Sequence, residues 1–324
     1  MQKGTVTKST GSWYNVRLDE ESPEEAIDLR CRVAGRFRLD DKKLTNPIAV
    51  GDRVSVVIEG TGDEETGAIR KIETRSNYVV RQSPRKKHEL HLLASNIDQA
   101  VLIVTLLYPD VKMGFIDRFL LMTEPFGIHT TIVFNKSDLL DEEDILTYEA
   151  IASIYKDIGY DVLLVSAEDG SNLDQFEALL KDKRSLLSGQ SGVGKSTLIN
   201  AIAPELDLRT GEISDHTGKG THTTTFAELF YLPFGGEIID PPGIKNLTFN
   251  YLKPIEIAYY YREIFALSPE CRFCGTCMHR LEPGCAVIAS VEAEDDRVTD
   301  IRYNSYLTLL AETEEQNYWE RRKV

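Results

Sequence analysis

The nine residues from 189 to 197 constrain the fold of this chain more than any other stretch. They match the phosphate-loop pattern Gly-x4-Gly-Lys-Ser/Thr at every fixed position. An apolar strand is predicted before them and a helix after them, and a glycine loop in this setting aims backbone N–H groups at phosphates. The candidate phosphate-binding residues are Gly189, Gln190, Ser191, Gly192, Val193, Gly194, Lys195, Ser196 and Thr197. Lys195 would contact the β- and γ-phosphates, and Ser196 would ligate Mg²⁺.

A second motif, Asn135-Lys136-Ser137-Asp138, follows an apolar strand and indicates which base the nucleotide carries. The carboxylate of Asp138 can accept two N–H bonds from guanine, and a site built on such bonds rejects other bases strongly. Taken alone, the four residues could equally cap a helix in a loop. Ser166-Ala167 favours guanine binding by Asn135, Lys136 and Asp138, because it ends a second buried strand and is typical of the backbone donor to the guanine carbonyl.

A third motif, Asp-x-x-Gly, ends another apolar strand at residues 240–243. Asp240 would hold Mg²⁺, and the N–H group of Gly243 would contact the γ-phosphate. The three motifs are those of a GTPase, but the base-binding motifs precede the phosphate loop instead of following it. Circular permutation explains this order, because the termini of a domain often lie close together. The helix predicted at 173–183 would then lead directly into the phosphate-loop strand.

Over nearly its whole length the chain resembles the RsgA family, circularly permuted GTPases that act in late maturation of the small ribosomal subunit. With this resemblance we expect an N-terminal all-β, OB-like RNA-binding barrel at 1–75, a basic linker at 76–87, a central α/β P-loop GTPase domain at 88–248 and a helical zinc-binding domain at 249–324. The resemblance also implies GTP as substrate, GDP as product, Mg²⁺ and one Zn²⁺ per chain as cofactors, and the small subunit with its rRNA as partner.

The segment at 215–225 occupies the position of the first switch loop. Thr223 and Thr224 are both candidates for contacting Mg²⁺ and the γ-phosphate, and the sequence does not choose between them. In Ras-type GTPases a glutamine after Asp-x-x-Gly orients the attacking water, whereas this chain has Ile244. His222, which matches a histidine of the family motif, is the candidate replacement. Thr221 stands where the family usually carries arginine, so no role is assigned to a cation there.

The N-terminal barrel is predicted from five short strands with alternating apolar residues, separated by glycine-rich turns. Strand pattern alone fits an OB or an SH3-like barrel, and the family resemblance favours OB. Aromatic and basic residues here could bind RNA bases and phosphates or could simply form the barrel core; they are Trp13, Tyr14, Arg36, Phe37 and Arg38. The basic run from Arg70 to Lys87 is either a charged linker or a contact to RNA phosphates.

Four of the five cysteines lie in the C-terminal region, beside His279. Three thiolates and one imidazole are the ligand set of a closed, structural zinc site. Cys271, Cys277, His279 and Cys285 are the favoured ligands, because Cys271-Arg272-Phe273 resembles the corresponding family run. Cys274 remains an alternative to Cys271, since the family spaces its first two cysteines by four residues and this chain spaces them by five.

The formal net charge of −15 means that contact with RNA must be local, through basic patches. No apolar run reaches the length of a membrane span, and the cysteine pattern suits a reducing compartment, so we expect a cytoplasmic monomer that does not bind membranes. The leading interpretation is a GTP hydrolase that is stimulated by the small ribosomal subunit and released from it by hydrolysis. The alternative, motivated by Ile244, is a GTP-sensing RNA-binding scaffold with negligible turnover.

Overall fold

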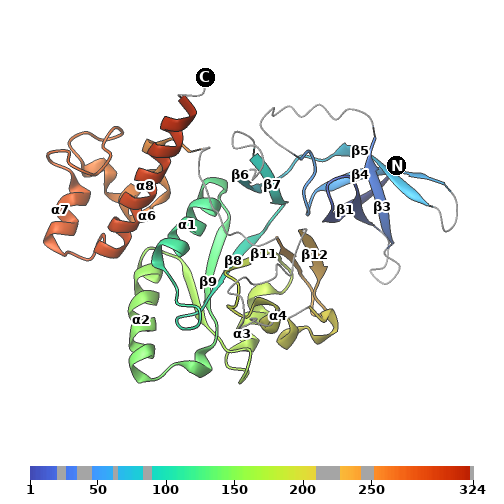
Figure 1. The fold of residues 1–324 in the computed structure, drawn as a ribbon, viewed down its shortest axis with the longest axis horizontal. Coiled ribbons are helices and arrows are strands. Elements are labelled where there is room, and N and C mark those ends of the chain that lie inside the picture. The colour runs from blue at the N-terminus through green and yellow to red at the C-terminus, as the bar shows by residue number, and fades with distance from the viewer. Residues whose placement is uncertain are drawn as a thin grey trace.

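The computed structural model describes residues 1–19, 27–34, 46–60, 65–82, 90–208, 227–241 and 252–321, apart from the side chains of residues 81, 82 and 316–321. In this part of the chain, a β-barrel and a helical C-terminal domain flank a central α/β domain on opposite sides (Figure 1). No described helix combines the length and the apolar composition needed to cross a bilayer.

Five strands form the N-terminal barrel, as the alternating pattern predicts. They are β1 (Gln2–Ser9), β2 (Tyr14–Leu18), β3 (Asp28–Val33), β4 (Arg53–Glu59) and β5 (Thr66–Ile72). Their order is β1-β2-β3-β5-β4, and a β1–β4 pairing closes the ring. The parallel β3–β5 pairing within this ring is that of an OB barrel. Tyr14 is buried in the barrel core, while Trp13 is half-buried with the guanidinium of Arg30 over its ring. Residues 36–38 lie outside the described part.

The central domain is a sheet with helices on both faces. Its strands are β8 (Gln99–Val104), β9 (His129–Phe134), β10 (Asp161–Leu164), β11 (Arg184–Gly189), β12 (Glu228–Tyr231) and β13 (Glu237–Asp240). Its helices are α1 (Met113–Thr123), α2 (Glu142–Asp157), α3 (Leu173–Leu180) and α4 (Lys195–Ile202), with the short 3₁₀ helices η3 (Glu124–Phe126), η4 (Ser137–Leu139) and η5 (Pro204–Leu206).

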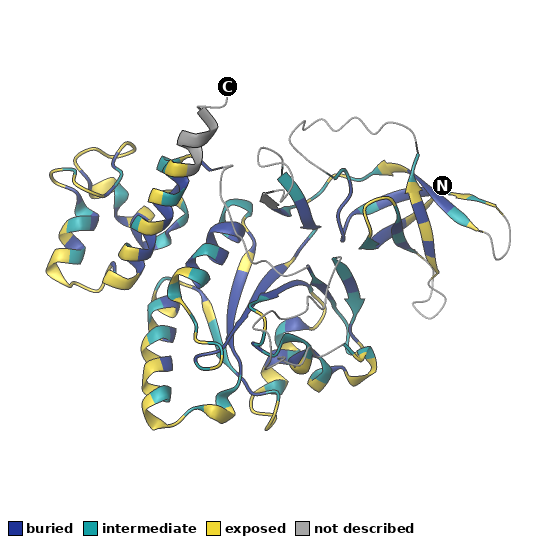
Figure 2. Cartoon of the chain, in the orientation of Figure 1, coloured by how far each residue is buried: buried dark blue, intermediate teal, exposed yellow. Residues whose placement is uncertain are grey.

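The spatial order β10-β9-β8-β11-β13-β12 places the phosphate-loop strand β11 at the centre of this sheet, although β8 to β10 precede it in sequence. All pairings are parallel except β12–β13. Strand β8 is buried throughout (Figure 2), as its continuous apolar sequence predicts for a parallel strand covered on both faces. Alternate residues of β8 belong to different cores: Leu102 lies in the same core as Phe119 of α1, and Ile103 lies in the same core as Phe176 of α3.

The C-terminal domain is helical. It contains α5 (Pro254–Ile257), η6 (Ala258–Tyr260), α6 (Arg262–Leu267), η7 (Ser268–Glu270), α7 (Ala286–Ala293) and α8 (Asp300–Arg321). Helix α8 packs against α1, and one apolar core runs from the central sheet into this domain. Helix α7 begins at Ala286, directly after the last cysteine.

The barrel and the central domain share one continuous sheet, because β1 pairs with β12. Lys8 on β1 and Glu228 on β12 form an ion pair at 2.8 Å across this junction. Strands β6 (Tyr78–Gln82) and β7 (Leu90–Ser95) form a separate antiparallel pair. Part of the range 76–87, expected from its sequence to be a linker, is therefore a strand. Arg75 of the basic run donates to the buried carboxylate of Asp52 at 2.7 Å, which gives this cation a structural partner within the chain.

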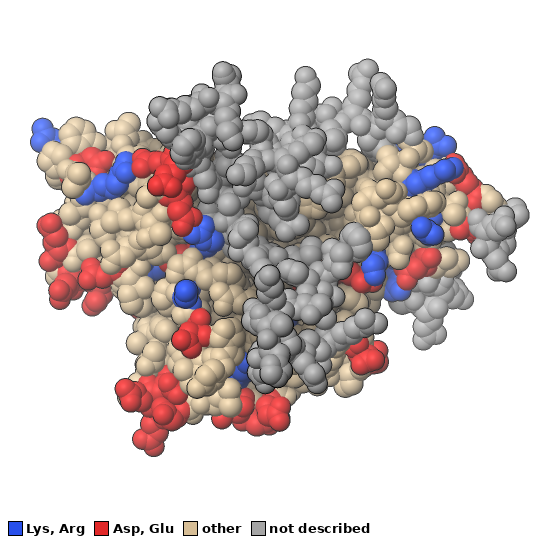
Figure 3. All heavy atoms as spheres, viewed as in Figure 1, with Lys and Arg blue, Asp and Glu red and all other residues tan. Residues whose placement is uncertain are grey.

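Charge is unevenly distributed over the face shown in Figure 3. Acidic side chains gather over α2 and over the C-terminal domain, whereas lysine and arginine are more frequent over the barrel. The first turn of α2 alone carries Glu142, Glu143 and Asp144, which also suits a helix N-terminus. On this face, positive side chains are therefore most frequent over the barrel.

Candidate functional site

The phosphate motif and the base motif lie at the same edge of the central sheet. Strand β11 ends at Gly189 and helix α4 begins at Lys195, so residues 190–194 form a loop between them. Strand β9 ends at Phe134, directly before Asn135, and lies one strand away from β11 across β8. Because neighbouring parallel strands end at the same edge, both motifs lie at one edge of the sheet, and open α/β sheets bind ligands at the carboxyl ends of their strands.

Asn135 holds the two motifs together. Its Nδ2 donates to the carbonyl oxygen of Val193 in the phosphate loop at 2.9 Å, and its Oδ1 accepts from the N–H of Ala167 at 3.3 Å. The contact with the phosphate loop explains a glycine: a Cβ on Gly194 would lie 2.6 Å from Nδ2 of Asn135, and the φ of Gly194 is +84°. Asn135 therefore fixes the distance between the loops for the base and the phosphates.

Asp138 is held by Ser166, the serine of the Ser-Ala pair. The Ser166 hydroxyl donates to Oδ1 of Asp138 at 2.5 Å and accepts from the N–H of Glu168 at 3.1 Å. Asp138 is exposed, so its carboxylate is accessible to a base. The hydrogen bond to Ser166 orients a carboxylate that would otherwise rotate freely, and an oriented acceptor is what recognition of a base edge needs.

Lys136 adopts a left-handed backbone conformation, with φ +69°. Its Nζ donates to the carbonyl oxygen of Tyr108 at 2.6 Å, in the loop after β8. Burial lowers the pKa of the Lys136 ammonium, and the nearby carboxylate of Asp138 opposes that shift. The Tyr108 carbonyl is a contact that sequence analysis missed, and no motif in that loop signals it.

The charged groups expected around phosphate and Mg²⁺ lie near one another. The ammonium of Lys195 donates to the carbonyl oxygen of Gly189 at 3.2 Å, so it lies over the phosphate loop. Burial lowers the pKa of Lys195, and the carboxylate of Asp240, at the end of β13, opposes this shift. Ser196 follows Lys195 in the first turn of α4. His222, Thr223, Thr224 and Gly243 lie outside the described residues.

A second cluster of functional side chains lies in the C-terminal domain. Cys271, Cys277, His279 and Cys285 are buried, and their ligand atoms all lie within 4.8 Å of one another. Cys274 is exposed and is not part of this group. Of the two cysteine sets that the sequence left open, the structure therefore brings together the one that contains Cys271.

The dimensions of this cluster fit a tetrahedral zinc ion. With Zn–S near ~2.3 Å and Zn–N near ~2.0 Å, a tetrahedron has edges of about 3.8 Å between sulfurs and about 3.5 Å between sulfur and nitrogen. The structure has 3.8 Å between the sulfurs of Cys271 and Cys285, and 3.6 Å and 3.4 Å from these sulfurs to Nδ1 of His279. Burial raises the pKa of the Cys277 and Cys285 thiols, so metal binding here would release protons.

Polar side chains around the cluster hold the loop that carries His279, and sequence patterns do not predict them. The carboxylate of Glu282 accepts from the N–H groups of Met278 and Arg280, both at 2.8 Å. From α8, the hydroxyl of Tyr303 donates to the carbonyl oxygen of His279 at 2.7 Å. These contacts involve backbone groups, for which no residue type near the cysteines is diagnostic.

Comparison with known proteins agrees with this architecture. The family model of the RsgA GTPase matches residues 72–250, and that of the RsgA N-terminal domain matches residues 3–69. The chain belongs to the RsgA family. A relative from Phocaeicola vulgatus, named small ribosomal subunit biogenesis GTPase RsgA, is 45% identical over 316 residues, which cover 98% of each chain. A relative of the same name from Flavobacterium johnsoniae is 44% identical and covers 97% of this chain and 94% of its own.

Solved structures of the family share the fold. YjeQ from Thermotoga maritima superposes with a TM-score of 0.73 at 31% identity, covering 96% of this chain and 98% of its own. YloQ, described as a circularly permuted GTPase, superposes with a TM-score of 0.71 at 30% identity and covers 98% and 96%. The predicted membership of the RsgA family and the rotated order of motifs are thereby confirmed.

Proposed function

We propose that this chain binds and hydrolyses GTP, acts in late maturation of the small ribosomal subunit, and leaves the subunit when GTP is hydrolysed. The observation that carries the nucleotide part is Asn135, which joins the phosphate loop to the base-binding loops through two hydrogen bonds. The names of the relatives support the subunit as partner. Such a partner would place the protein in the cytoplasm, where we propose that it acts as a monomer.

In this proposal the base is bound by Asp138 and Lys136. The N–H of Ala167, whose bond to Asn135 is long at 3.3 Å, would be shared between Asn135 and the guanine carbonyl. Residues 189–197 surround the phosphates, and Lys195 neutralises charge on the β- and γ-phosphates. Ser196 and Asp240 ligate Mg²⁺. When bound, this ion would lower the energy of the negative charge that develops during phosphoryl transfer.

The remaining catalytic assignments rest on the sequence. Thr223 or Thr224 would contact Mg²⁺ and the γ-phosphate. The N–H of Gly243 would also contact the γ-phosphate. A neutral imidazole at His222 would orient the attacking water in place of the glutamine that Ile244 replaces. We expect slow hydrolysis in the free protein and faster hydrolysis once the subunit orders the loop that carries His222.

The two flanking domains would bind the partner. The barrel at 1–75 and the basic linker at 76–87 would contact rRNA, because lysine and arginine are more frequent over the barrel than over α2. Residues 88–248 would form the GTPase domain. In the domain at 249–324, one structural Zn²⁺ would be held by Cys271, Cys277, His279 and Cys285. The ligand–ligand distances of a tetrahedral zinc site match the distances in this cluster.

Turnover of GTP with and without purified small subunits tests the proposal. We expect the subunit to raise the rate of phosphate release severalfold or more, and His222→Ala to lose this stimulation while keeping its affinity for GTP. The His222→Ala protein should also stay on the subunit after GTP is added. Binding of GTP and subunit without measurable turnover in the wild-type protein would favour the alternative, a GTP-sensing scaffold. Stimulated turnover that survives in His222→Ala would remove this histidine from the catalytic group.

A further inference from the structure

His279 presents one ring nitrogen to the cysteines and the other to a serine. Its Nδ1 lies 3.6 Å from the sulfur of Cys271 and 3.4 Å from that of Cys285. Its Nε2 lies 3.2 Å from the hydroxyl oxygen of Ser268. The ring is 1% exposed, so water cannot easily satisfy Nε2 in place of the serine.

The hydrogen bonds of Ser268 determine which nitrogen of His279 carries the proton. The Ser268 hydroxyl donates its one proton to the carbonyl oxygen of Ile264 at 2.8 Å. A serine hydroxyl has a single proton, so the same oxygen can only accept from the ring. The network therefore assigns the proton of the neutral imidazole to Nε2 and leaves the lone pair of Nδ1 directed at the sulfurs.

Ser268 is itself held firmly by the fold. It is the residue after α6 and the first residue of η7, three positions before Cys271. Helix α6 is anchored by Glu263, which accepts from Nε of Arg302 on α8 at 2.7 Å. His279 has φ +53°, and its carbonyl oxygen is fixed by Tyr303, also from α8. The serine and the histidine ring are thus held by the same helix from two sides.

We propose that Ser268 is a positioning residue of the metal centre: it selects the tautomer of His279 with the proton on Nε2 and thereby makes Nδ1 the metal ligand. Histidine ligands of metals usually donate their second N–H to a carboxylate, a backbone carbonyl or water, and loss of such a partner typically costs 10–100-fold in affinity, in order of magnitude. Here a serine hydroxyl takes that role. This inference rests on the proposal that the four side chains bind Zn²⁺.

The test compares three variants of the full chain: Ser268→Ala, Ser268→Thr and Thr313→Ala. Ser268→Thr keeps a hydroxyl in the same position. Thr313 is a matched control, because its hydroxyl also donates to the carbonyl four residues earlier, that of Leu309, and it lies away from the cysteine cluster. Zinc affinity is measured by competition with a chromophoric chelator. We expect about 10–100-fold weaker binding in Ser268→Ala, and near wild-type binding in the other two.

Nitrogen-15 NMR of the histidine side chains in the zinc-loaded wild-type chain reports the tautomer directly. We expect Nδ1 of His279 to bind the metal and Nε2 to carry a proton that exchanges slowly with water. This spectrum decides the tautomer even if Ser268→Ala fails to fold. Binding through Nε2, or a zinc affinity of Ser268→Ala within twofold of wild type, would overturn the inference and leave the zinc site standing. A wild-type chain that binds no zinc would overturn both.

Discussion

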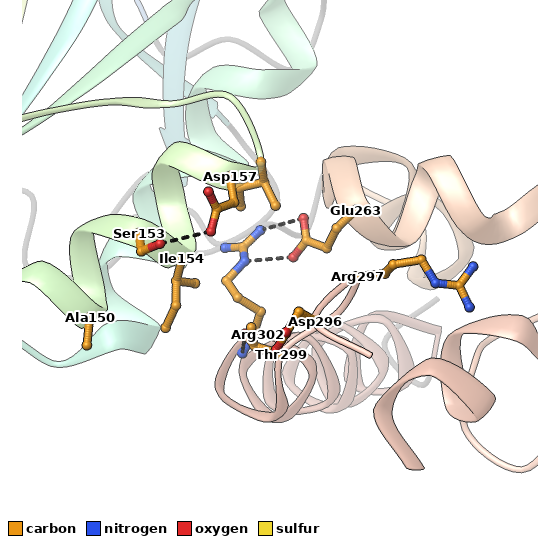
Figure 4. A pocket seen from close by; sticks show the side chains of 10 residues that line it. Ala150, Ser153, Ile154, Asp157, Glu263, Asp296, Arg297, Thr299 and Arg302 are labelled. Carbon is orange, nitrogen blue, oxygen red and sulfur yellow. Dashed lines mark hydrogen bonds and ion pairs between the residues drawn. The ribbon is translucent and has the colours of Figure 1, made fainter. Parts of the chain in front are cut away.

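Arg302 on α8 and Asp117 on α1 form a buried ion pair that joins the C-terminal domain to the GTPase domain. Nη1 of Arg302 donates to Oδ1 of Asp117. Nε of the same guanidinium donates to Glu263 on α6, and Figure 4 shows this second contact. Arg302 is 2% exposed and Asp117 is 1% exposed. Burial lowers the pKa of Arg302, but the two carboxylates outweigh this effect and raise it well above the ordinary value.

Removing this arginine should loosen the C-terminal domain. Arg302→Ala leaves Asp117 and Glu263 as buried charges without a cation, which typically costs about 3–5 kcal/mol. We expect the amides of α8 to exchange on the order of 10²-fold faster or more, as measured by hydrogen exchange with mass spectrometry. Adding Asp117→Asn should restore part of the protection, because it removes one of the uncompensated charges.

Arg297 provides the matched control for that prediction. It lies in the same domain as Arg302, and both arginines line a cavity of about 340 Å³ between α2 and the C-terminal helices. Arg297 pairs with Asp295 at 2.7 Å. Its side chain is 49% exposed, so water screens this pair and Arg297→Ala should change exchange little. Equal effects of the two substitutions would show that burial of Arg302 does not matter.

A second prediction concerns Gly51, where the barrel meets the GTPase domain. A Cβ at this position would lie 2.2 Å from the carbonyl oxygen of Ser95, and the φ of Gly51 is +91°. The carbonyl of Gly51 also accepts from Arg184 at 3.0 Å, and the N–H of Ser95 donates to Val50 at 2.9 Å. Gly51→Ala should therefore push the barrel away from β7 and speed hydrogen exchange at the Ser95 amide.

Gly11→Ala is the control that separates the steric clash at Gly51 from the backbone strain that both substitutions cause. Gly11 has the same φ of +91°, but a Cβ there would meet nothing within 4 Å. Both Gly→Ala changes cost about 1–2 kcal/mol for the left-handed backbone, and Gly51→Ala adds an overpacking cost of about 1–3 kcal/mol. If Ser95 exchanges at the same rate in both variants, contact between the two domains does not depend on Gly51.

Much of the fold follows from local sequence patterns. The apolar run in β8 and the alternation in β1 and β2 are enough to find these strands, and the motif loops lie at their ends. The interdomain contacts could not be found in this way. Lys8 and Glu228 are 220 residues apart, and Arg302 and Asp117 are 185 apart, so no window of sequence contains both partners. Each of these residues has the appearance of a surface charge until its partner is known.

In the candidate site, too, some residues are predictable from sequence and others are not. The residues of the motifs are visible because their types and spacings are fixed by the chemistry of guanine, phosphate and zinc. The groups that hold them are less visible, because several residue types can perform that task. Tyr108 holds Lys136 through a backbone carbonyl, which every residue type possesses. Ser268 and Glu282 hold His279 and its loop through single polar atoms, in positions that carry no spacing rule.

A third prediction concerns the metal. Zinc content, measured by atomic absorption, should fall from one ion per chain to near zero in Cys271→Ser and should stay near one in Cys274→Ser, because Cys274 is exposed and outside the cluster. Removal of zinc with a chelator should unfold residues near 271–285. Guanine nucleotide binding should persist, since Lys195 and Asp138 lie in another domain. Zinc retained by Cys271→Ser but lost by Cys274→Ser would reverse the assignment of ligands.

The last prediction tests the base. Asp138→Asn places an amide donor where the carboxylate accepted an N–H, so xanthine, which presents a carbonyl there, should replace guanine as the preferred base. We expect affinity for GTP to fall on the order of 10²-fold or more and affinity for XTP to rise, measured with fluorescent nucleotide analogues. Asp141→Asn is the matched control: Asp141 caps α2 by accepting from Glu143 and Asp144, and asparagine caps a helix equally well. A variant at 138 that still prefers GTP to XTP would mean that another group reads the base. An equal loss of GTP affinity in Asp141→Asn would trace the effect to the fold of the 135–144 segment instead of to base recognition.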